Sequence, residues 1–269
     1  MTFATLTLAH EQRTAIVTLN RPEKRNAISL QMIADVEAAL HEIESSSARV
    51  AIVTGAGKAF CAGMDLETLQ AFQGQSPAEV LEDARRIAGF FRRLHTFPKP
   101  LIAAVNGAAV AGGCGIATLA DFTLAAPEAK FGYTEVKVGF MPAIVATFVL
   151  RQFGEKRARD LLLSGRIFPA AEAQALGLVN EIVPGERLLE RARELASELA
   201  ELSPTALRHT KRLLVQLSER ELDRELELAI QASTVVRATA DFREGLAAFL
   251  EKRQPRWQDE HPSQWTPEE

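Results

Sequence analysis

The chain has 269 residues, of which 47% are hydrophobic and 25% are charged, and its formal net charge is -4. A chain of this length can bury a substantial core, and the composition is that of an ordinary globular protein. The slightly acidic balance offers no basic footprint, so we do not expect nucleic acid as a partner.

The first half of the chain alternates strand and helix patterns. Short runs rich in apolar and β-branched residues end at turns, and the stretches between them repeat apolar residues at helical spacing. Continuous apolar strands separated by helices are typical of a parallel sheet covered on both faces, which predicts an α/β fold. The expected strands lie at 14–19, 49–55 and 101–105, and the expected helices at 30–43, capped by Ser29, and at 77–94.

Residues 100–115 are the most informative segment, because an apolar strand breaks there into a glycine cluster and continues as a helix of small residues. Glycine lets a ligand approach the backbone, and the first N–H groups of a helix lack intrahelical partners. Such a turn therefore attracts an anion or a developing oxyanion. Two other interpretations stay open for this segment: glycines that serve only packing, and a membrane span, since residues 101–120 carry no charge. The glycines and Asn106 argue against the span, so we expect no membrane association.

The second half changes character after two further expected strands, at 122–125 and 179–183. From about Leu188 onward the pattern is helical, and Ser203-Pro204 predicts a helix start with proline at the first position. A long helical tail with apolar faces needs a surface to pack on. We therefore expect the protein to self-associate.

Cys61 and Cys114 are the two cysteines, too few for a disulfide framework and without metal-ligand spacing. The five histidines are scattered and form no catalytic or metal-binding pair. No secretory signal is visible among the first residues of this sequence. We therefore expect a cytoplasmic protein without a metal site.

Three further segments carry groups suited to chemistry beside the glycine run. Residues 58–66 follow an expected strand and form a second turn that contains glycine. Residues 131–135 end in a carboxylate, Glu135, and residues 19–27 place two cations in a loop after the first strand. Each segment is a weak signal by itself, but together they have a characteristic order and spacing.

In that order and spacing the segments resemble the enoyl-CoA hydratase/isomerase family, the crotonase superfamily, from Leu19 to about Trp257. The resemblance implies a ββα spiral core at residues 1–200 and a C-terminal helical trimerisation region at 201–269. It also implies an acyl-CoA substrate, a homotrimer or homohexamer, and no cofactor other than the coenzyme A of the substrate.

Family motifs transfer to particular positions of this sequence. The backbone N–H groups of Met64 and Gly112 match the pair that holds the thioester oxygen of acyl-CoA, and Glu135 matches a catalytic acid/base. An oxyanion held in this way can develop into an enolate. The resemblance places CoA- and substrate-binding positions at Lys24, Arg25, Ala27, Ala62, Asp65, Leu66, Gly115, Met141, Ala143 and Lys252.

The sequence departs from the family pattern at Gly115, where hydratases of the family carry a second glutamate. Adding water needs a base for the water and an acid for the α-carbon, whereas moving a double bond needs only one shuttling base. The overall resemblance favours a 2-enoyl-CoA hydratase. A 3-enoyl to 2-enoyl-CoA isomerase that uses a single glutamate and a weakly catalytic CoA-binding scaffold stay open as alternatives. If Gly115 limits water activation, Gly115→Glu should raise hydration.

Other carboxylates do not obviously replace the missing glutamate. We expect Asp121 to serve a turn or cap, Asp65 to orient its own loop, and Glu67 and Glu82 to be solvated. Phe140, Met141 and Ile144 form either an apolar acyl pocket or part of the core.

Overall fold

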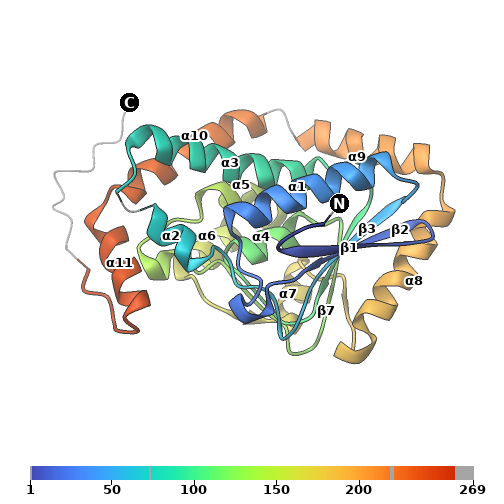
Figure 1. Cartoon of the computed structure of the whole chain (residues 1–269), viewed down its shortest axis with the longest axis horizontal. Coiled ribbons are helices and arrows are strands. Elements are labelled where there is room, and N and C mark those ends of the chain that lie inside the picture. The colour runs from blue at the N-terminus through green and yellow to red at the C-terminus, as the bar shows by residue number, and fades with distance from the viewer. Residues whose placement is uncertain (1, 73, 219–220, 258–269) are drawn as a thin grey trace.

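Two sheets organise the computed structural model, which describes residues 2–72, 74–218 and 221–257 (Figure 1). The larger sheet has the order β1-β2-β3-β5-β7-β10, in which β1 is antiparallel to β2 and the other neighbours are parallel. The smaller sheet has the order β4-β6-β8-β9. The strands are β1 (Leu6–Glu11), β2 (Thr14–Leu19), β3 (Val50–Gly55), β4 (Ala59–Cys61), β5 (Leu101–Val105), β6 (Ala108–Val110), β7 (Phe122–Ala125), β8 (Lys130–Gly132), β9 (Phe168–Pro169) and β10 (Glu181–Ile182).

Helices cover both faces of the larger sheet and extend beyond it at the C-terminal end (Figure 1). The α-helices are α1 (Leu30–Ser45), α2 (Leu66–Ala71), α3 (Pro77–His95), α4 (Gly112–Leu119), α5 (Ala143–Phe153), α6 (Glu155–Ser164), α7 (Ala170–Leu176), α8 (Leu188–Glu201), α9 (Pro204–Ser218), α10 (Leu222–Arg237) and α11 (Ala240–Leu250). Three short 3₁₀ helices among the described residues are η1 (Pro22–Lys24), η2 (Glu135–Val138) and η3 (Gly185–Arg187).

A repeated strand-strand-helix unit links the two sheets. The strands β3, β5 and β7 of the larger sheet lead directly into β4, β6 and β8 of the smaller one, and each short strand is followed by a helix. This is the predicted ββα spiral of an α/β protein. Because β4, β6 and β8 run parallel to one another, their carboxyl ends meet at one edge of the small sheet.

Local signals place the helix starts where the sequence predicts them. The Ser29 hydroxyl accepts a hydrogen bond from the Met32 N–H at 3.1 Å and caps α1. Helix α3 begins with proline behind a reciprocal capping box between Ser76 and Glu79. The last predicted strand is shorter than expected, since β10 pairs with β7 only at Glu181 and Ile182.

The uncharged segment 101–120 divides into β5, β6, α4 and the loops between them. Within the part of the chain that the structure describes, no helix combines the length and the apolar character that a bilayer crossing requires. The segment is instead the buried centre of the fold, since all of β5 is buried.

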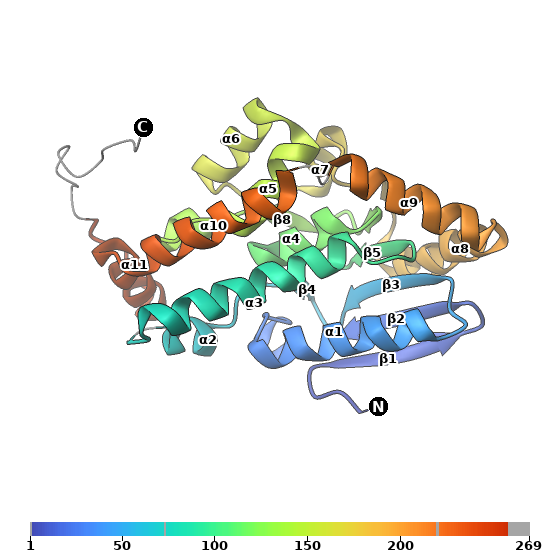
Figure 2. The same ribbon diagram turned by 90° about the horizontal axis from the view of Figure 1, so that it is seen from above.

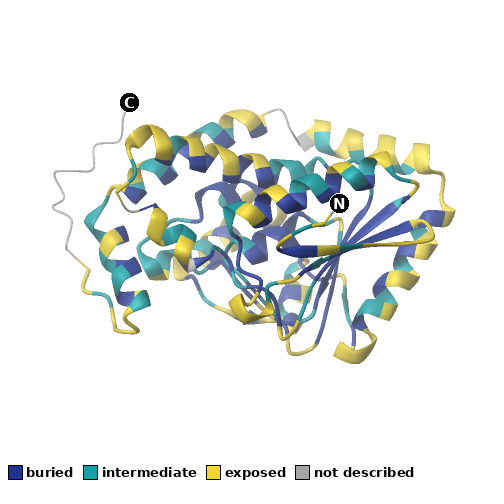
Figure 3. Cartoon of the chain, viewed as in Figure 1, coloured by how far each residue is buried: buried dark blue, intermediate teal, exposed yellow. Residues whose placement is uncertain are grey.

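The C-terminal region divides into parts with different surroundings. Helix α10 lies alongside α3 and also packs on α5, and its residues Leu222, Leu226 and Ile230 belong to the main core (Figure 2). By contrast, α9 is almost entirely exposed, including Leu214 and Leu217 (Figure 3). Part of the region predicted at 201–269 therefore completes the core of its own chain.

Candidate active site

A cavity lies at the edge where the three short parallel strands end. Ala62 and Met64 follow β4, Ala111 and Gly112 follow β6, and Thr134 and Glu135 follow β8. The remaining walls are mostly apolar and come from α1, α2, α3, α5, α10 and α11 as well as from η2 and the loops. They include Ile28, Ile33, Leu69, Phe72, Ile87, Phe90, Phe91, Val138, Phe140, Met141, Pro142, Ala143, Ile144, Val145, Ser233, Arg237, Leu246 and Phe249.

The turn after β4 leaves the Met64 N–H without an acceptor in the described part of the chain. An isolated parallel bridge is formed by Ile28, whose N–H donates to Gly63 O at 2.7 Å and whose carbonyl accepts from Asp65 N at 2.8 Å. Met64 lies between these two partners, and its N–H has no protein acceptor in the described ranges. Because the residue borders the cavity, this N–H is available to an acceptor there.

The turn after β6 presents a second unused N–H beside the first. Ala111 has φ 49° and ψ -126°, an uncommon backbone conformation for a non-glycine residue, and its N–H is held by Gly132 O at 2.7 Å. Gly112 then begins α4, and its N–H also lacks an acceptor among the residues described. Gly63, at φ +84°, packs so closely that a Cβ there would lie 2.8 Å from Ala111 Cβ. The close packing at glycine brings the two turns together.

Glu135 supplies the titratable group of the cavity. Its Oε2 atom is buried and has no hydrogen-bond partner in the described part of the chain. Desolvation in these apolar surroundings raises the pKa of Glu135 from 4.5 to about 7, against the opposing effect of its own backbone N–H. At neutral pH the carboxyl group can therefore both accept and return a proton.

Close backbone packing fixes the short helix that carries Glu135. A Cβ on Gly139 would lie 2.3 Å from Asp241 O, and one on Gly245 would lie 2.4 Å from Val138 C. Helix α11 therefore approaches η2 at distances that only glycine permits. The position of the carboxylate depends on a C-terminal helix that lies more than a hundred residues further along the chain.

The shifted pKa of Glu135 predicts a pH dependence of stability. Between pH 4.5 and about 7 the unfolded carboxyl group loses its proton while the folded one retains it, so the folded state binds more protons. The free energy of unfolding of wild type should therefore fall, relative to that of Glu135→Gln, by about 3 kcal/mol in total as pH rises through this window. Urea denaturation of both proteins at several pH values measures the difference, and a difference independent of pH would contradict it.

Six of the predicted site positions line the cavity together. Those that line the cavity are Met64, Gly112, Glu135, Ala62, Met141 and Ala143. Of the other predicted positions, Ala27 is buried and Lys252 is exposed just after α11, and neither lines the cavity. Leu66 begins α2, and its side chain lies outside the described part of the structure.

Among the charged predicted positions, Lys24 and Asp65 make side-chain contacts with other residues of the protein. Lys24 is exposed and donates to Glu67 Oε1 at 2.7 Å. Arg25 is also exposed, at φ 51°. Asp65 is buried, caps α2 and accepts a hydrogen bond from Arg21 at 2.7 Å, so it does orient its own loop.

The acidic residues that were expected to lie outside the site do so. Asp121 Oδ2 accepts from Leu101 N at 2.7 Å and pairs with Lys211 Nζ at 2.6 Å, a structural role. Glu67 and Glu82 are largely exposed, with 71% and 76% of their side-chain surface accessible. Glu135 is therefore the only carboxylate among the described residues that line the cavity.

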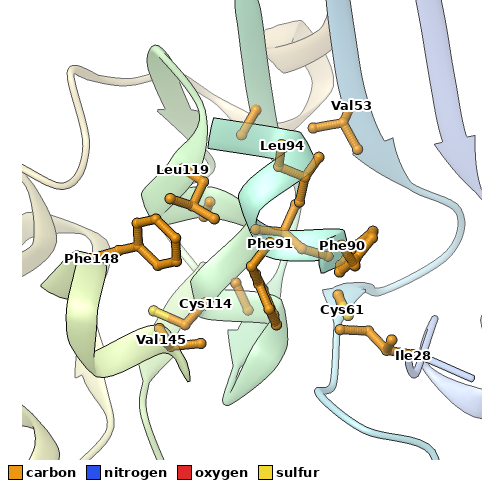
Figure 4. Close-up of a cluster of buried hydrophobic side chains, with 14 of the residues drawn as sticks. Ile28, Val53, Cys61, Phe90, Phe91, Leu94, Cys114, Leu119, Val145 and Phe148 are labelled. Atoms are coloured by element: carbon orange, nitrogen blue, oxygen red, sulfur yellow. The ribbon is translucent and has the colours of Figure 1, made fainter. Parts of the chain in front are cut away.

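Gly115 requires a correction, because it does not line the cavity. A Cβ at this position would lie 2.9 Å from both Phe91 Cε1 and Val145 Cγ2. Figure 4 shows Phe91 and Val145, together with Cys114, in the cluster of buried apolar side chains around α4. These two side chains occupy the space that a glutamate at position 115 would need, so glycine here is part of the packing.

Because of this packing, we expect Gly115→Glu to destabilise the protein and not to raise hydration. Inserting a carboxylate between Phe91 and Val145 overpacks the core and buries a charge, so the variant should lose about 2 kcal/mol of stability or more. Thermal unfolding of wild type, Gly115→Ala and Gly115→Glu should give successively lower midpoints. An unchanged midpoint together with faster hydration would contradict this prediction.

Sequence reasoning did not find Arg237, a cation in the cavity wall. Helix α10 buries Leu226, Ile230, Ser233 and Arg237 on one face. These residues follow helical spacing, so an arginine on an otherwise apolar stripe was the available signal. Whether this arginine lies at a cavity or in the core depends on which other elements α10 packs against.

Comparisons with known proteins match nearly the whole chain. The sequence model of the family described as Enoyl-CoA hydratase/isomerase matches residues 9–260. A putative enoyl-CoA hydratase of Thermus thermophilus is 46% identical, covering 90% of this chain and 96% of that one. A 2,3-dehydroadipyl-CoA hydratase of Escherichia coli is 38% identical, with 93% and 97% covered. The crystal structure of an enoyl-CoA hydratase/isomerase from Xanthobacter autotrophicus has a TM-score of 0.87 at 30% identity and covers 96% of this chain and all of that chain.

Proposed function

Because the chain belongs to the enoyl-CoA hydratase/isomerase family, we propose that it is an enoyl-CoA hydratase, which converts a 2-enoyl-CoA into a 3-hydroxyacyl-CoA. The observation that carries the proposal is that three groups at one cavity have no hydrogen-bond partner among the described residues: Glu135 Oε2 and the N–H groups of Met64 and Gly112. Relatives named hydratases over nearly the whole chain support the same choice.

The two N–H groups would hold the thioester oxygen of the substrate. As hydroxide adds to the β-carbon, negative charge moves to this oxygen, and hydrogen bonds that strengthen there lower the barrier. Gly112 also lies at the N-terminus of α4, where the helix dipole favours negative charge. Each donor of such a pair is worth roughly 3 kcal/mol of transition-state stabilisation.

Glu135 would act in both proton transfers. Its carboxylate accepts a proton from water while the oxygen of that water bonds to the β-carbon, and the carboxylic acid then gives the proton to the α-carbon. The two steps add one water in total and regenerate the carboxylate. A pKa of about 7 suits a group that alternates between the two forms.

A second candidate, 3-enoyl to 2-enoyl-CoA isomerisation, is favoured by one observation. Glu135 is the single carboxylate among the described residues lining the cavity, and moving a double bond requires only one base that takes a proton and returns it. The same oxyanion donors would serve this reaction.

Turnover of a 2-enoyl-CoA and a 3-enoyl-CoA by the same preparation separates these candidates. We expect wild type to hydrate crotonyl-CoA faster than it isomerises 3-hexenoyl-CoA. The loss of enoyl absorbance measures the hydration. Faster isomerisation would reassign the activity, and binding without either reaction would indicate a CoA-binding scaffold.

We propose further that coenzyme A is part of the substrate, that the protein needs no other cofactor, and that it is cytoplasmic. Arg25, Lys252 and Lys24 are exposed cations that would bind CoA phosphates, Lys24 by exchanging its ion pair with Glu67. The exposed leucines of α9, Leu213, Leu214 and Leu217, would be covered in a homotrimer or homohexamer. Sedimentation equilibrium measures this assembly, and a monomer would contradict it.

A further inference from the structure

The guanidinium group of Arg237 is buried in the wall of the cavity that contains Glu135. Only 7% of the residue surface is exposed, and the Nε and Nη1 atoms have no hydrogen-bond partner among the described residues. Two aromatic rings border the group: its Cζ lies 4.0 Å from the centroid of Phe72 and 5.6 Å from that of Phe140. These rings hold the guanidinium by cation–π attraction, and among the described residues they leave Nε and Nη1 without an acceptor.

Among the described residues, none supplies a direct counter-ion for this cation. No described carboxylate lies within 4.0 Å of Arg237 in an ion pair, although Asp83 contributes a longer-range attraction. The Asp83 carboxylate instead accepts a hydrogen bond from Gln75 at 2.7 Å. Desolvation lowers the pKa of Arg237 to about 10, so the group still carries its charge at neutral pH.

A buried charge without a contacting partner costs stability unless a bound group satisfies it. Guanidinium donors match the geometry of a carboxylate, which can accept hydrogen bonds from two of them at once. Arg237 lines the same cavity as Glu135 and packs beside Phe140, one of the apolar residues expected to surround the acyl chain. The cavity therefore combines an acid/base, oxyanion donors and a separate anion-binding group.

We propose that Arg237 binds a terminal carboxylate on the acyl chain, so that the preferred substrates are the mono-CoA thioesters of unsaturated dicarboxylic acids. This substrate class rests on the proposed enoyl-CoA chemistry at Glu135. The carboxylate of the substrate pairs with Arg237 at one end of the cavity. The thioester oxygen accepts hydrogen bonds from the N–H groups of Met64 and Gly112. Arg237 is then a specificity-determining residue that takes no part in proton transfer.

Kinetics with matched pairs of substrates test the assignment. Each pair consists of a trans-2-enoyl-CoA and the trans-2-enedioyl mono-CoA thioester of equal carbon number, compared over a series of lengths. For the best-fitting length, wild type should favour the carboxylate-bearing substrate by about tenfold or more in kcat/KM, mainly through KM. In Arg237→Met this preference should be lost, with kcat for the unsubstituted substrate within about threefold of wild type.

Two further variants control for charge and fold. Arg243→Met removes a nearby exposed cation that does not line the cavity, and it should retain the preference. Arg237→Lys keeps the positive charge but loses the planar guanidinium group, so it should retain part of the preference for the carboxylate-bearing substrate. Equal activity of wild type on both members of every pair, or an equal loss on both in Arg237→Met, would overturn the assignment.

A binding measurement separates failure of the proposed enoyl-CoA reaction from failure of the Arg237 assignment. If wild type turned over neither substrate, calorimetry with the saturated dicarboxylic and monocarboxylic acyl-CoA thioesters would still test Arg237. Tighter binding of the carboxylate-bearing ligand, lost in Arg237→Met and retained in Arg243→Met, would support the binding role. Equal affinities in wild type would contradict it.

Discussion

Replacing Glu135 by glutamine is expected to lower kcat for enoyl-CoA hydration by about 10³-fold or more, because one side chain performs both proton transfers. The amide keeps the shape of the carboxyl group but cannot accept a proton. Since Glu135 is the only described carboxylate that lines the cavity, no neighbouring group there can replace it. Stopped-flow or steady-state assays with crotonyl-CoA measure the loss.

Retention of the fold and of ligand binding is the control for this variant. Glu135→Gln should bind a saturated acyl-CoA with an affinity close to that of wild type, because the proposed oxyanion donors are the backbone N–H groups of Met64 and Gly112, which the substitution leaves in place. The variant should also be more stable than wild type at pH 8, since it avoids ionising a buried carboxyl group. Activity within about threefold of wild type would refute the catalytic role.

Replacing Gly112 by proline is expected to lower kcat by about 10²- to 10³-fold relative to Gly112→Ala, because proline removes the N–H that would contact the thioester oxygen. Alanine is the matched control: it adds the Cβ, which would lie 3.0 Å from Ile28 Cδ1, but retains the donor. The ratio of the two variants therefore isolates the hydrogen bond from the effect of packing.

Circular dichroism and thermal unfolding of both Gly112 variants establish that they are folded. Proline also restricts the preceding residue, and Ala111 already has a φ of 49°, so some loss of stability is expected in Gly112→Pro. Among folded proteins, equal kcat values for the proline and alanine variants would show that the Gly112 N–H does not stabilise the transition state.

The sequence was sufficient to predict the order of the elements and the backbone parts of the site. Ser29 and the proline of Ser203-Pro204 mark helix starts that the structure confirms for α1 and α9. The glycine runs predict turns after strands, and parallel pairing then brings Met64, Gly112 and Glu135 to one edge. These features depend on local backbone chemistry and on strand order, which sequence patterns report well.

Side-chain packing between distant elements was not predictable in the same way. Gly115 matched a catalytic position of the family, yet Phe91 from α3 and Val145 from α5 fill the space beside it. Arg237 lies in a helix that was expected to mediate assembly, and it borders the cavity because α10 packs on α3 and α5. Neither contact has a signal within a short window of sequence, since each depends on how helices far apart in the chain meet.

A crystal structure of the Glu135→Gln variant with a bound trans-2-enoyl-CoA is the most direct test of the site. The thioester oxygen should lie within about 3.2 Å of both Met64 N and Gly112 N, with the introduced amide side chain facing the α- and β-carbons. A thioester oxygen more than about 3.5 Å from both nitrogens, or an acyl group bound outside this cavity, would contradict the account.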